Sequence, residues 1–303
     1  MSKTSRVTAR TLAPVIACVG VTAFAAAAAA DSGPRARQVT QAELAHFDSH
    51  AAWRLVRKQV AVGQRPAGSP QLRKLADDLR RLLPGGKFER IPHQHGLRNI
   101  VETVPGRRPG ILIGAHYDTL TEPKGFVGAN NAAAGTAVVI GVAQALTAAR
   151  LDSTGRQIRF VLFDGEEPAS GLPEQNRDFY HAGLRGSRAY VARHPHGTAA
   201  MILLDYVGNK GLRLPREGSS DESMWRKLRR SADAAGTESY FPDSTETSII
   251  DDHTPFLRAG IPAVDLIDWS YPGHSRQDGL DKLSVRSADG VGETVVELLR
   301  TLR

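Results

Sequence analysis

Short apolar runs bounded by turn residues recur along the chain and predict buried strands. Four of them cover residues 111–115, 158–163, 200–204 and 262–267. Between several of these runs the apolar residues follow helical spacing, most clearly over residues 132–150. Strands that alternate with helices predict a largely parallel sheet with helices on both faces. Because no linker, internal repeat or heptad pattern interrupts residues 41–303, we expect a single α/β domain there.

Three further segments carry helix signals. Ser69 precedes a proline and an amphipathic run over residues 72–83, which predicts a capped helix. Ser219 and Glu222 resemble a capping box in front of another helix. Apolar residues at helical spacing over residues 287–302 predict a C-terminal helix that closes the fold.

The N-terminus has the pattern of a secretory signal peptide. Residues 1–10 carry basic and no acidic side chains, and the uncharged segment after them ends in an alanine run. We expect residues 1–30 to be removed, residues 31–40 to form a polar leader, and the protein to be secreted or periplasmic. A membrane anchor is less favoured because alanine is weakly apolar, so no stable membrane span is expected. Another alternative is a lipoprotein, since the segment around Cys18 resembles a lipobox.

Composition narrows the chemistry. The chain has 303 residues, one cysteine and a formal net charge of +7 at pH 7. With one cysteine, neither an internal disulfide nor a four-thiolate zinc cage can form, so His, Asp or Glu must hold any metal. Part of the positive charge lies in the signal peptide, and the rest is mixed with acids along helices. The charge therefore does not predict a nucleic-acid partner.

Ionisable residues follow each of the four apolar runs. In chain order they are His116, Asp118, Glu166, Glu167, Asp205 and His274. Open α/β sheets place their sites in the crevice at the carboxyl ends of the strands, so we expect these side chains to converge. Two imidazoles with several carboxylates and no cysteine suit a hydrolytic zinc centre. Each residue alone has a plainer interpretation as a polar cap or a solvated loop residue, and only the joint pattern predicts a site.

Spacing within this set predicts separate roles. His116 and Asp118 lie two residues apart, so in extended chain they point to the same side and Asp118 can orient the imidazole. Glu166 and Glu167 are neighbours at a strand end and therefore point in different directions. One of them can bind metal while the other faces the substrate as the general base.

Seven motifs in order resemble the zinc aminopeptidase family that also contains the glutaminyl cyclases. They lie at residues 115–119, 128–135, 163–167, 183–190, 203–208, 251–262 and 271–284. The resemblance implies a three-layer α/β/α sandwich around a mixed, mostly parallel sheet. It also implies metal-ligand roles for His116, Glu167, Asp205 and His274.

The resemblance extends to the reaction and its substrate. Glu166 matches the general acid and base, Asp118 the acid behind His116, and Asp252 an acid near the substrate end of the pocket. The expected substrates are peptide or protein N-termini. Residues expected around the substrate are Trp269, Tyr271 and His253.

One position departs from the family pattern. Asn131 stands where the family carries an aspartate that binds zinc, and that bridges both ions in two-zinc members. An amide cannot bridge two Zn²⁺ ions, and the lost charge weakens attraction for a second cation. We therefore expect reduced zinc affinity, with one ion favoured over two, and keep Asn131 as a candidate ligand. The alternative is that Asn130 or Asn131 is only a turn residue before a helix.

Three functions remain open. In a zinc aminopeptidase, metal-activated water attacks the peptide bond and Glu166 transfers the proton. In a glutaminyl cyclase, the substrate's own amine attacks its glutamine side chain. The cyclases carry tryptophans in the loop after the paired glutamates and just before the zinc-binding His. Here residues 168–179 contain no tryptophan and Gly273 precedes His274, so Trp269 substitutes only if its loop folds back. We therefore favour the peptidase, and the third function is a catalytically impaired binding protein, which Asn131 alone supports.

Overall fold

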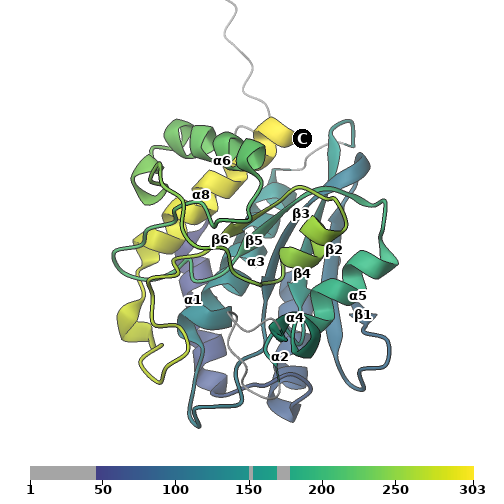
Figure 1. Ribbon diagram of the computed structural model, residues 1–303, viewed down its shortest axis with the longest axis vertical. Helices are drawn as coiled ribbons and strands as arrows, with labels where there is room; N and C mark the ends of the chain where they lie inside the picture. Colours follow the sequence, from purple (N-terminus) through teal and green to yellow (C-terminus); the bar gives the residue numbers. More distant parts are fainter. Residues whose placement is uncertain (1–45, 150–152, 169–177) are drawn as a thin grey trace, which may run out of the picture. The chain divides into compact units, whose positions relative to one another are not determined.

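A six-stranded sheet in the order β1-β2-β4-β3-β5-β6 forms the centre of the fold (Figure 1). The computed structural model describes residues 46–149, 153–168 and 178–303, so the expected signal peptide, the polar leader and Cys18 lie outside the described residues. The strands are β1 (Lys87–Arg90), β2 (Arg98–Val104), β3 (Arg107–His116), β4 (Arg156–Phe163), β5 (Thr198–Leu204) and β6 (Ala263–Leu266).

The sheet is mixed and mostly parallel, as the resemblance implied. β4, β3, β5 and β6 run parallel, whereas β2 pairs antiparallel with β4 and β1 antiparallel with β2. The four parallel strands are those that the apolar runs predicted. The two antiparallel strands β1 and β2 were not predicted, because polar residues such as Asn99 and Glu102 interrupt the apolar pattern of β2.

Helices cover both faces of the sheet and complete three layers (Figure 1). Alternate residues along β3 divide the core, since Ile111 and Ile113 belong to the larger cluster and Leu112 to the smaller one. The larger cluster includes side chains of α1 (Ser49–Val62), α2 (Pro70–Leu82), α3 (Gly135–Ala148), α6 (Glu222–Ala234) and α8 (Val285–Leu302). The smaller cluster includes side chains of α5 (Arg185–Arg193) and α7 (Thr254–Arg258).

Short helical segments connect these layers. The π-helical turn η2 (Ala129–Ala134) leads into α3, and α4 (Phe179–Ala182) leads into α5. Two 3-10 turns, η3 (Glu238–Tyr240) and η4 (Leu280–Lys282), lie on the path to α8. The segment Ala129–Ala148 is the one helix among the described residues that is long and apolar enough to cross a membrane. Since 83% of its most apolar stretch is buried, we interpret it as a core helix.

The caps at the starts of the helices agree only in part with those that the sequence predicted. Ser69 caps α2 as predicted, and the C-terminal helix α8 is present. The capping box predicted before α6 is wrong, because the side chain of Asp221 accepts the hydrogen bond from the backbone N–H of Met224. The Ser219 hydroxyl instead lies 2.8 Å from Nε2 of His253. The helix therefore begins two residues later than a cap at Ser219 would place it.

Glu102 is an acidic residue on the apolar face of β2. Its neighbours on that face, Ile100 and Val104, belong to the larger core cluster, and Glu102 itself is only 4% exposed. Its Oε2 atom has no hydrogen-bond partner within the described part of the chain. Burial raises the pKa of Glu102 from 4.5 to about 8.

We expect Glu102→Gln to stabilise the protein at alkaline pH. Because the pKa of Glu102 is higher in the folded chain, folding retains a proton between pH 4.5 and about 8, and wild-type stability falls as the pH rises through that window. The variant should gain roughly 1–3 kcal/mol in free energy of unfolding at pH 8.5 and little at pH 5. Urea unfolding at both pH values measures this.

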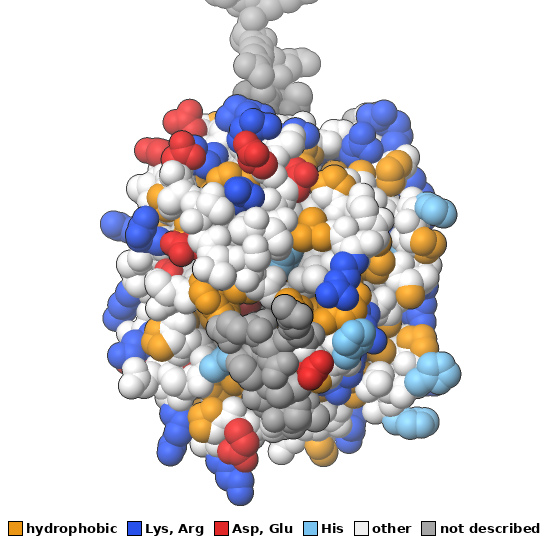
Figure 2. All heavy atoms as spheres, in the orientation of Figure 1, with side chains coloured by type: hydrophobic (Ala, Val, Ile, Leu, Met, Phe, Trp, Pro, Cys, Tyr) orange, Lys and Arg blue, Asp and Glu red, His pale blue; other side chains and the backbone are white. Residues whose placement is uncertain are grey.

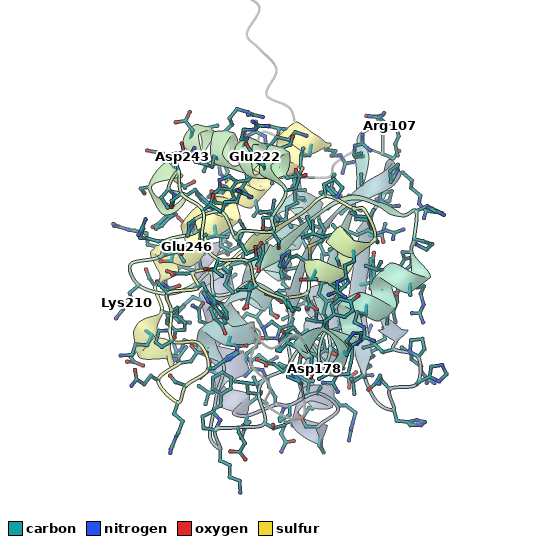
Figure 3. The ribbon with its side chains drawn as sticks, in the orientation of Figure 1. Arg107, Asp178, Lys210, Glu222, Asp243 and Glu246 are labelled. Carbon is teal, nitrogen blue, oxygen red and sulfur yellow. The ribbon has the colours of Figure 1, made fainter. Side chains whose placement is uncertain are left out.

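Glu222→Gln is the matched control, since Glu222 is exposed at the periphery of α6 (Figure 3). This control should change stability by less than about 0.5 kcal/mol at either pH. An equal gain for Glu102→Gln at pH 5 and pH 8.5 would show that the buried carboxyl does not titrate in this range.

Candidate active site

Side chains from the carboxyl ends of β3, β4 and β5 meet, as parallel strands require. His116 ends β3, and its Nε2 atom lies 3.6 Å from Oδ1 of Asp205, which follows β5. The other ring nitrogen, Nδ1, lies 3.6 Å from Oε2 of Glu166, which follows β4. All three side chains are buried. The structure thus brings together residues that are widely separated in the sequence.

Asp118 organises the turn that carries the paired glutamates. Its carboxylate accepts hydrogen bonds from the backbone N–H groups of Gly165, Glu166 and Glu167, at 3.0–3.2 Å. The distance from its Oδ1 atom to Nδ1 of His116 is 3.7 Å, which is too long for a hydrogen bond. Asp118 therefore fixes the position of the glutamates directly and influences His116 by charge.

Glu166 is a buried carboxyl among other acids. Burial raises its pKa well above the ordinary value, and the nearby Glu167, Asp251 and Asp252 raise it further, while His116 lowers it. A carboxyl with a raised pKa can both take up and release a proton near neutral pH. Glu166 is thus suited to proton transfer at this site.

A second pair of ligand-type side chains lies beside the first. Nε2 of His274 is 3.8 Å from Oε1 of Glu167. The same Glu167 atom accepts a hydrogen bond of 2.9 Å from the Nδ2 amide of Asn131, which also donates to the Tyr206 hydroxyl at 3.2 Å. Asn131 therefore directs N–H groups, and not an oxygen, towards the Glu167–His274 pair. The resemblance implies an aspartate at this position.

Asn131 is held in place by its backbone and not as a helix cap. Its backbone N–H donates to Oδ2 of Asp278, and no side-chain cap hydrogen bond forms at the start of η2. The following residue, Ala132, has a φ of +103°, which is unusual for a residue with a side chain. Asn130 donates its backbone N–H to Oδ1 of the same Asp278, and its side-chain Oδ1 accepts a hydrogen bond from the backbone N–H of Gly208. The side chains of the two asparagines thus make different long-range contacts.

The ligand pairs fit a zinc ion only in part. Tetrahedral zinc with ordinary bond lengths places ligand atoms about 3.3–3.6 Å apart, close to the separations in the His116–Asp205 and Glu167–His274 pairs. A catalytic zinc needs three protein ligands, yet no group of three His, Cys, Asp or Glu arranged for a metal occurs among the residues described. The Oδ1 atom of Asn131 is buried and has no hydrogen-bond partner there. A half-turn of this amide would give the second pair an oxygen as third ligand.

An aromatic pocket of about 330 Å³ adjoins His274. Trp269 and Tyr271 line it with Tyr206, whose ring stacks on Trp269 with 6.2 Å between centroids and 4° between planes. A Cβ atom on Gly273 would lie 2.3 Å from the Tyr206 ring, so this ring occupies the space of a side chain before His274. The loop after β6 thus folds back beside His274, and Tyr206 supplies an aromatic wall that the sequence pattern did not predict.

His253 lies apart from this aromatic pocket. It is fully buried, with Nε2 3.3 Å from Oε2 of Glu217 and Nδ1 3.5 Å from Oδ2 of Asp265. Asp252 is also fully buried, and burial and its neighbour Asp251 raise its pKa well above the ordinary value. Neither side chain lines the pocket beside His274. Asp265 was not predicted as a site residue, although an acid within a predicted buried strand was an available signal.

Comparison with known proteins identifies the family. Residues 99–299 match the sequence profile of Peptidase family M28, which is more than half of the chain. The chain belongs to Peptidase family M28. This membership confirms the resemblance drawn from the seven motifs, and the match begins in β2 and ends within α8.

The M28 relatives include the two kinds of enzyme that the sequence left open. A bovine glutaminyl-peptide cyclotransferase is 26% identical over 229 residues, which are 64% of this chain and 63% of that protein. The match therefore spans less than two thirds of the length of that relative. Among solved structures, an Acidobacteriales bacterium glutaminyl cyclase has a TM-score of 0.73 and 27% identity, covering 85% of this chain and 95% of the other. A leucine aminopeptidase precursor from Bacteroides thetaiotaomicron has a TM-score of 0.73 and 25% identity, covering 86% and 99%.

Proposed function

We propose that this M28 protein is a glutaminyl cyclase that uses a single zinc ion to convert N-terminal glutamine of peptides into pyroglutamate. The aromatic pocket beside His274 carries the proposal. Trp269 and Tyr206 supply the aromatic surface that the sequence lacked directly before His274, which removes one of the two reasons for preferring a peptidase. A pocket of about 330 Å³ suits one small side chain.

The loss of the family aspartate supports the same choice. Asn131 cannot bridge two cations, so a reaction that needs two ions is disfavoured. Cyclisation requires only one polarising ion and a proton acceptor, because the nucleophile is the substrate's own amine. Glu167 and His274, with the Asn131 carbonyl oxygen after a half-turn of the amide, would hold that ion. When bound, zinc would polarise the side-chain carbonyl of the substrate glutamine.

The protein's own side chains then manage the proton. The α-amine nitrogen attacks the side-chain amide carbon, a C–N bond forms, and the bond to the amide nitrogen breaks to release ammonia. Glu166 would take the proton from the attacking amine and return it to the leaving nitrogen. Asp118 holds the Glu166 backbone, and therefore keeps its carboxyl aimed at the reacting atoms. The buried surroundings of Glu166 exclude water, which would otherwise compete as a nucleophile.

An aminopeptidase of the same family is the second candidate. The His116–Asp205 pair favours it, because this pair retains the ligands of a further ion that cyclisation does not need. A peptidase would release a free amino acid, whereas a cyclase releases ammonia and leaves the peptide chain intact. The products therefore distinguish the two reactions.

We expect zinc-supplemented protein to release ammonia from a glutamine-initiated peptide without shortening it. Mass spectrometry of the peptide should show a loss of 17 Da (about one ammonia) with the sequence otherwise unchanged. A leucine arylamide serves as the peptidase substrate in the same assay. Release of free amino acid or arylamine would contradict the cyclase proposal and establish a peptidase. If neither ammonia nor a hydrolysis product is released, the protein is a binding protein.

We further propose that the protein is exported. Support comes only from the sequence, through the charged start, uncharged segment and alanine run of residues 1–30. Mass spectrometry of the mature N-terminus from a culture supernatant would test cleavage after Ala30. A lipid on Cys18 would instead establish the lipoprotein alternative.

A further inference from the structure

A basic groove of about 980 Å³ lies between α5 and α7. Apolar side chains such as Ile91 and Val191 line part of it. Four arginines also line it, and no acidic side chain does within the described residues. They are Arg185, Arg188, Arg193 and Arg258. In Figure 2, Lys or Arg side chains lie next to hydrophobic ones over these helices.

Three of these four arginines make no ion pair with an acidic side chain of the described residues, although the charge of Arg185 acts on the nearby buried Asp164. Arg193 lies 3.3 Å from Glu89, but Arg185 and Arg188 donate only to backbone carbonyl groups among the described residues. A carbonyl satisfies the N–H groups without neutralising the positive charge. The groove therefore holds an excess of positive charge.

Arg258 is the most available of the three. Its side chain is exposed and its guanidinium lies 3.6 Å from the centroid of the Tyr180 ring. It makes no hydrogen bond or ion pair within the part of the chain that the structure describes. Stacking on Tyr180 fixes the plane of the guanidinium and leaves its N–H edge free for a carboxylate. Asp178, at the start of α4, is an acid on this side of the molecule, yet it does not line the groove (Figure 3).

The wall of the groove is hydrogen-bonded to the candidate active site. Arg185 donates to the backbone carbonyls of Gly165 and Glu167 at 3.1 and 2.6 Å, and the backbone N–H of Leu184 donates to the carbonyl of Glu166 at 2.9 Å. The same turn therefore supports the catalytic carboxyl on one side and the basic groove on the other. A ligand in the groove lies against the back of this turn.

We infer that the groove binds acidic residues downstream in a peptide whose N-terminus occupies the candidate active site, an inference that rests on the proposed function. Arginine pairs with carboxylates through two parallel N–H···O bonds, and the apolar lining suits an extended peptide segment. A cavity of this volume fits a few residues of a peptide and not a nucleic-acid duplex. The substrate class is thus peptides with glutamate or aspartate a few positions after the N-terminal residue.

Binding is tested separately from turnover with the full-length zinc-loaded protein and two fluorescent peptides. Both begin with glutamine, and positions 3 to 6 are glutamate in one and glutamine in the other. Fluorescence anisotropy should show about tenfold tighter binding of the acidic peptide at low salt, and salt at about 1 M should remove most of this advantage. Arg258→Gln should reduce the advantage at low salt to about threefold or less.

Arg57→Gln is the matched control, because Arg57 is exposed on α1, on the opposite face of the sheet, and the substitution removes the same charge. It should leave the preference for the acidic peptide unchanged. Equal binding of both peptides, equal loss with Arg57→Gln, or equal competition by a DNA duplex would overturn the inference. If ammonia release fails while the Arg258-dependent preference persists, the cyclase proposal falls and the groove assignment stands.

Discussion

Replacement of Asn131 by aspartate should raise the zinc affinity of this protein by about tenfold to a hundredfold. Substitutions around metal ligands change affinity by that range, and a direct charged ligand should do no less. In the wild type, the Asn131 amide donates to Oε1 of Glu167 at 2.9 Å and competes with a metal for that oxygen. In the variant, a carboxylate replaces the amide N–H donor and supplies a third ligand beside Glu167 and His274.

The metal-free variant should also be less stable than the wild type. Two carboxylates about 3 Å apart repel each other, and one of them must take up a proton or move. Zinc relieves this repulsion, so the rise in melting temperature on adding zinc should be larger for Asn131→Asp than for the wild type. Calorimetric titration with Zn²⁺ measures the affinity, and thermal unfolding with and without zinc measures the linkage. Neither readout depends on knowing the substrate.

Asn130→Asp is the control for added charge. Asn130 neighbours Asn131 and is also buried, but its side chain faces Gly208 and Asn209. This variant should destabilise the fold without strengthening zinc binding. If Asn131→Asp binds zinc no more tightly than the wild type, the identity of residue 131 does not limit the metal site.

Much of the fold followed from the apolar runs, because each parallel strand is buried on both faces. The runs at residues 111–115 and 200–204 coincide with the buried parts of β3 and β5. β2 was not predicted because Glu102 and Asn99 break its pattern. Asn99 satisfies its amide through the backbone of Gly186, a contact between residues 87 apart in sequence. Such long-range satisfaction of a polar group leaves no local signal.

The candidate site was predictable to about the same extent as the fold. Ligand-type residues at strand ends indicated that His116, Glu166 and Asp205 converge, and the structure brings them together. The sequence could not indicate that the Asn131 amide bonds to Glu167, because this depends on side-chain orientation across two loops. The role of Tyr206 was equally hidden.

Tyr206 shows why some site residues escape prediction. Its backbone has a φ of +41°, a conformation that residues other than glycine rarely adopt. This turn directs the ring against Gly273 and Trp269. The position of the Tyr206 ring therefore depends on a backbone conformation that no residue pattern predicted.

Replacement of Glu166 by glutamine should reduce turnover about 10²–10⁴-fold, the contribution expected of a positioned proton-transfer group. Glutamine has nearly the same shape but cannot accept the proton of the attacking amine. Zinc affinity should stay within about threefold of the wild type, because Glu166 is not assigned as a ligand. Turnover is measured as ammonia release, or as arylamine release if the peptidase activity is found, and zinc binding by calorimetric titration.

Two further variants serve as controls for Glu166→Gln. Glu246→Gln, at an exposed position (Figure 3), removes the same charge and should leave turnover unchanged. Glu166→Asp keeps the carboxyl but shortens it, so it should retain more activity than the glutamine variant. If Glu166→Gln keeps more than about a tenth of wild-type turnover while binding zinc normally, another buried acid, such as Asp252, must transfer the proton. If turnover and zinc affinity fall together, Glu166 acts on the metal site and not in proton transfer.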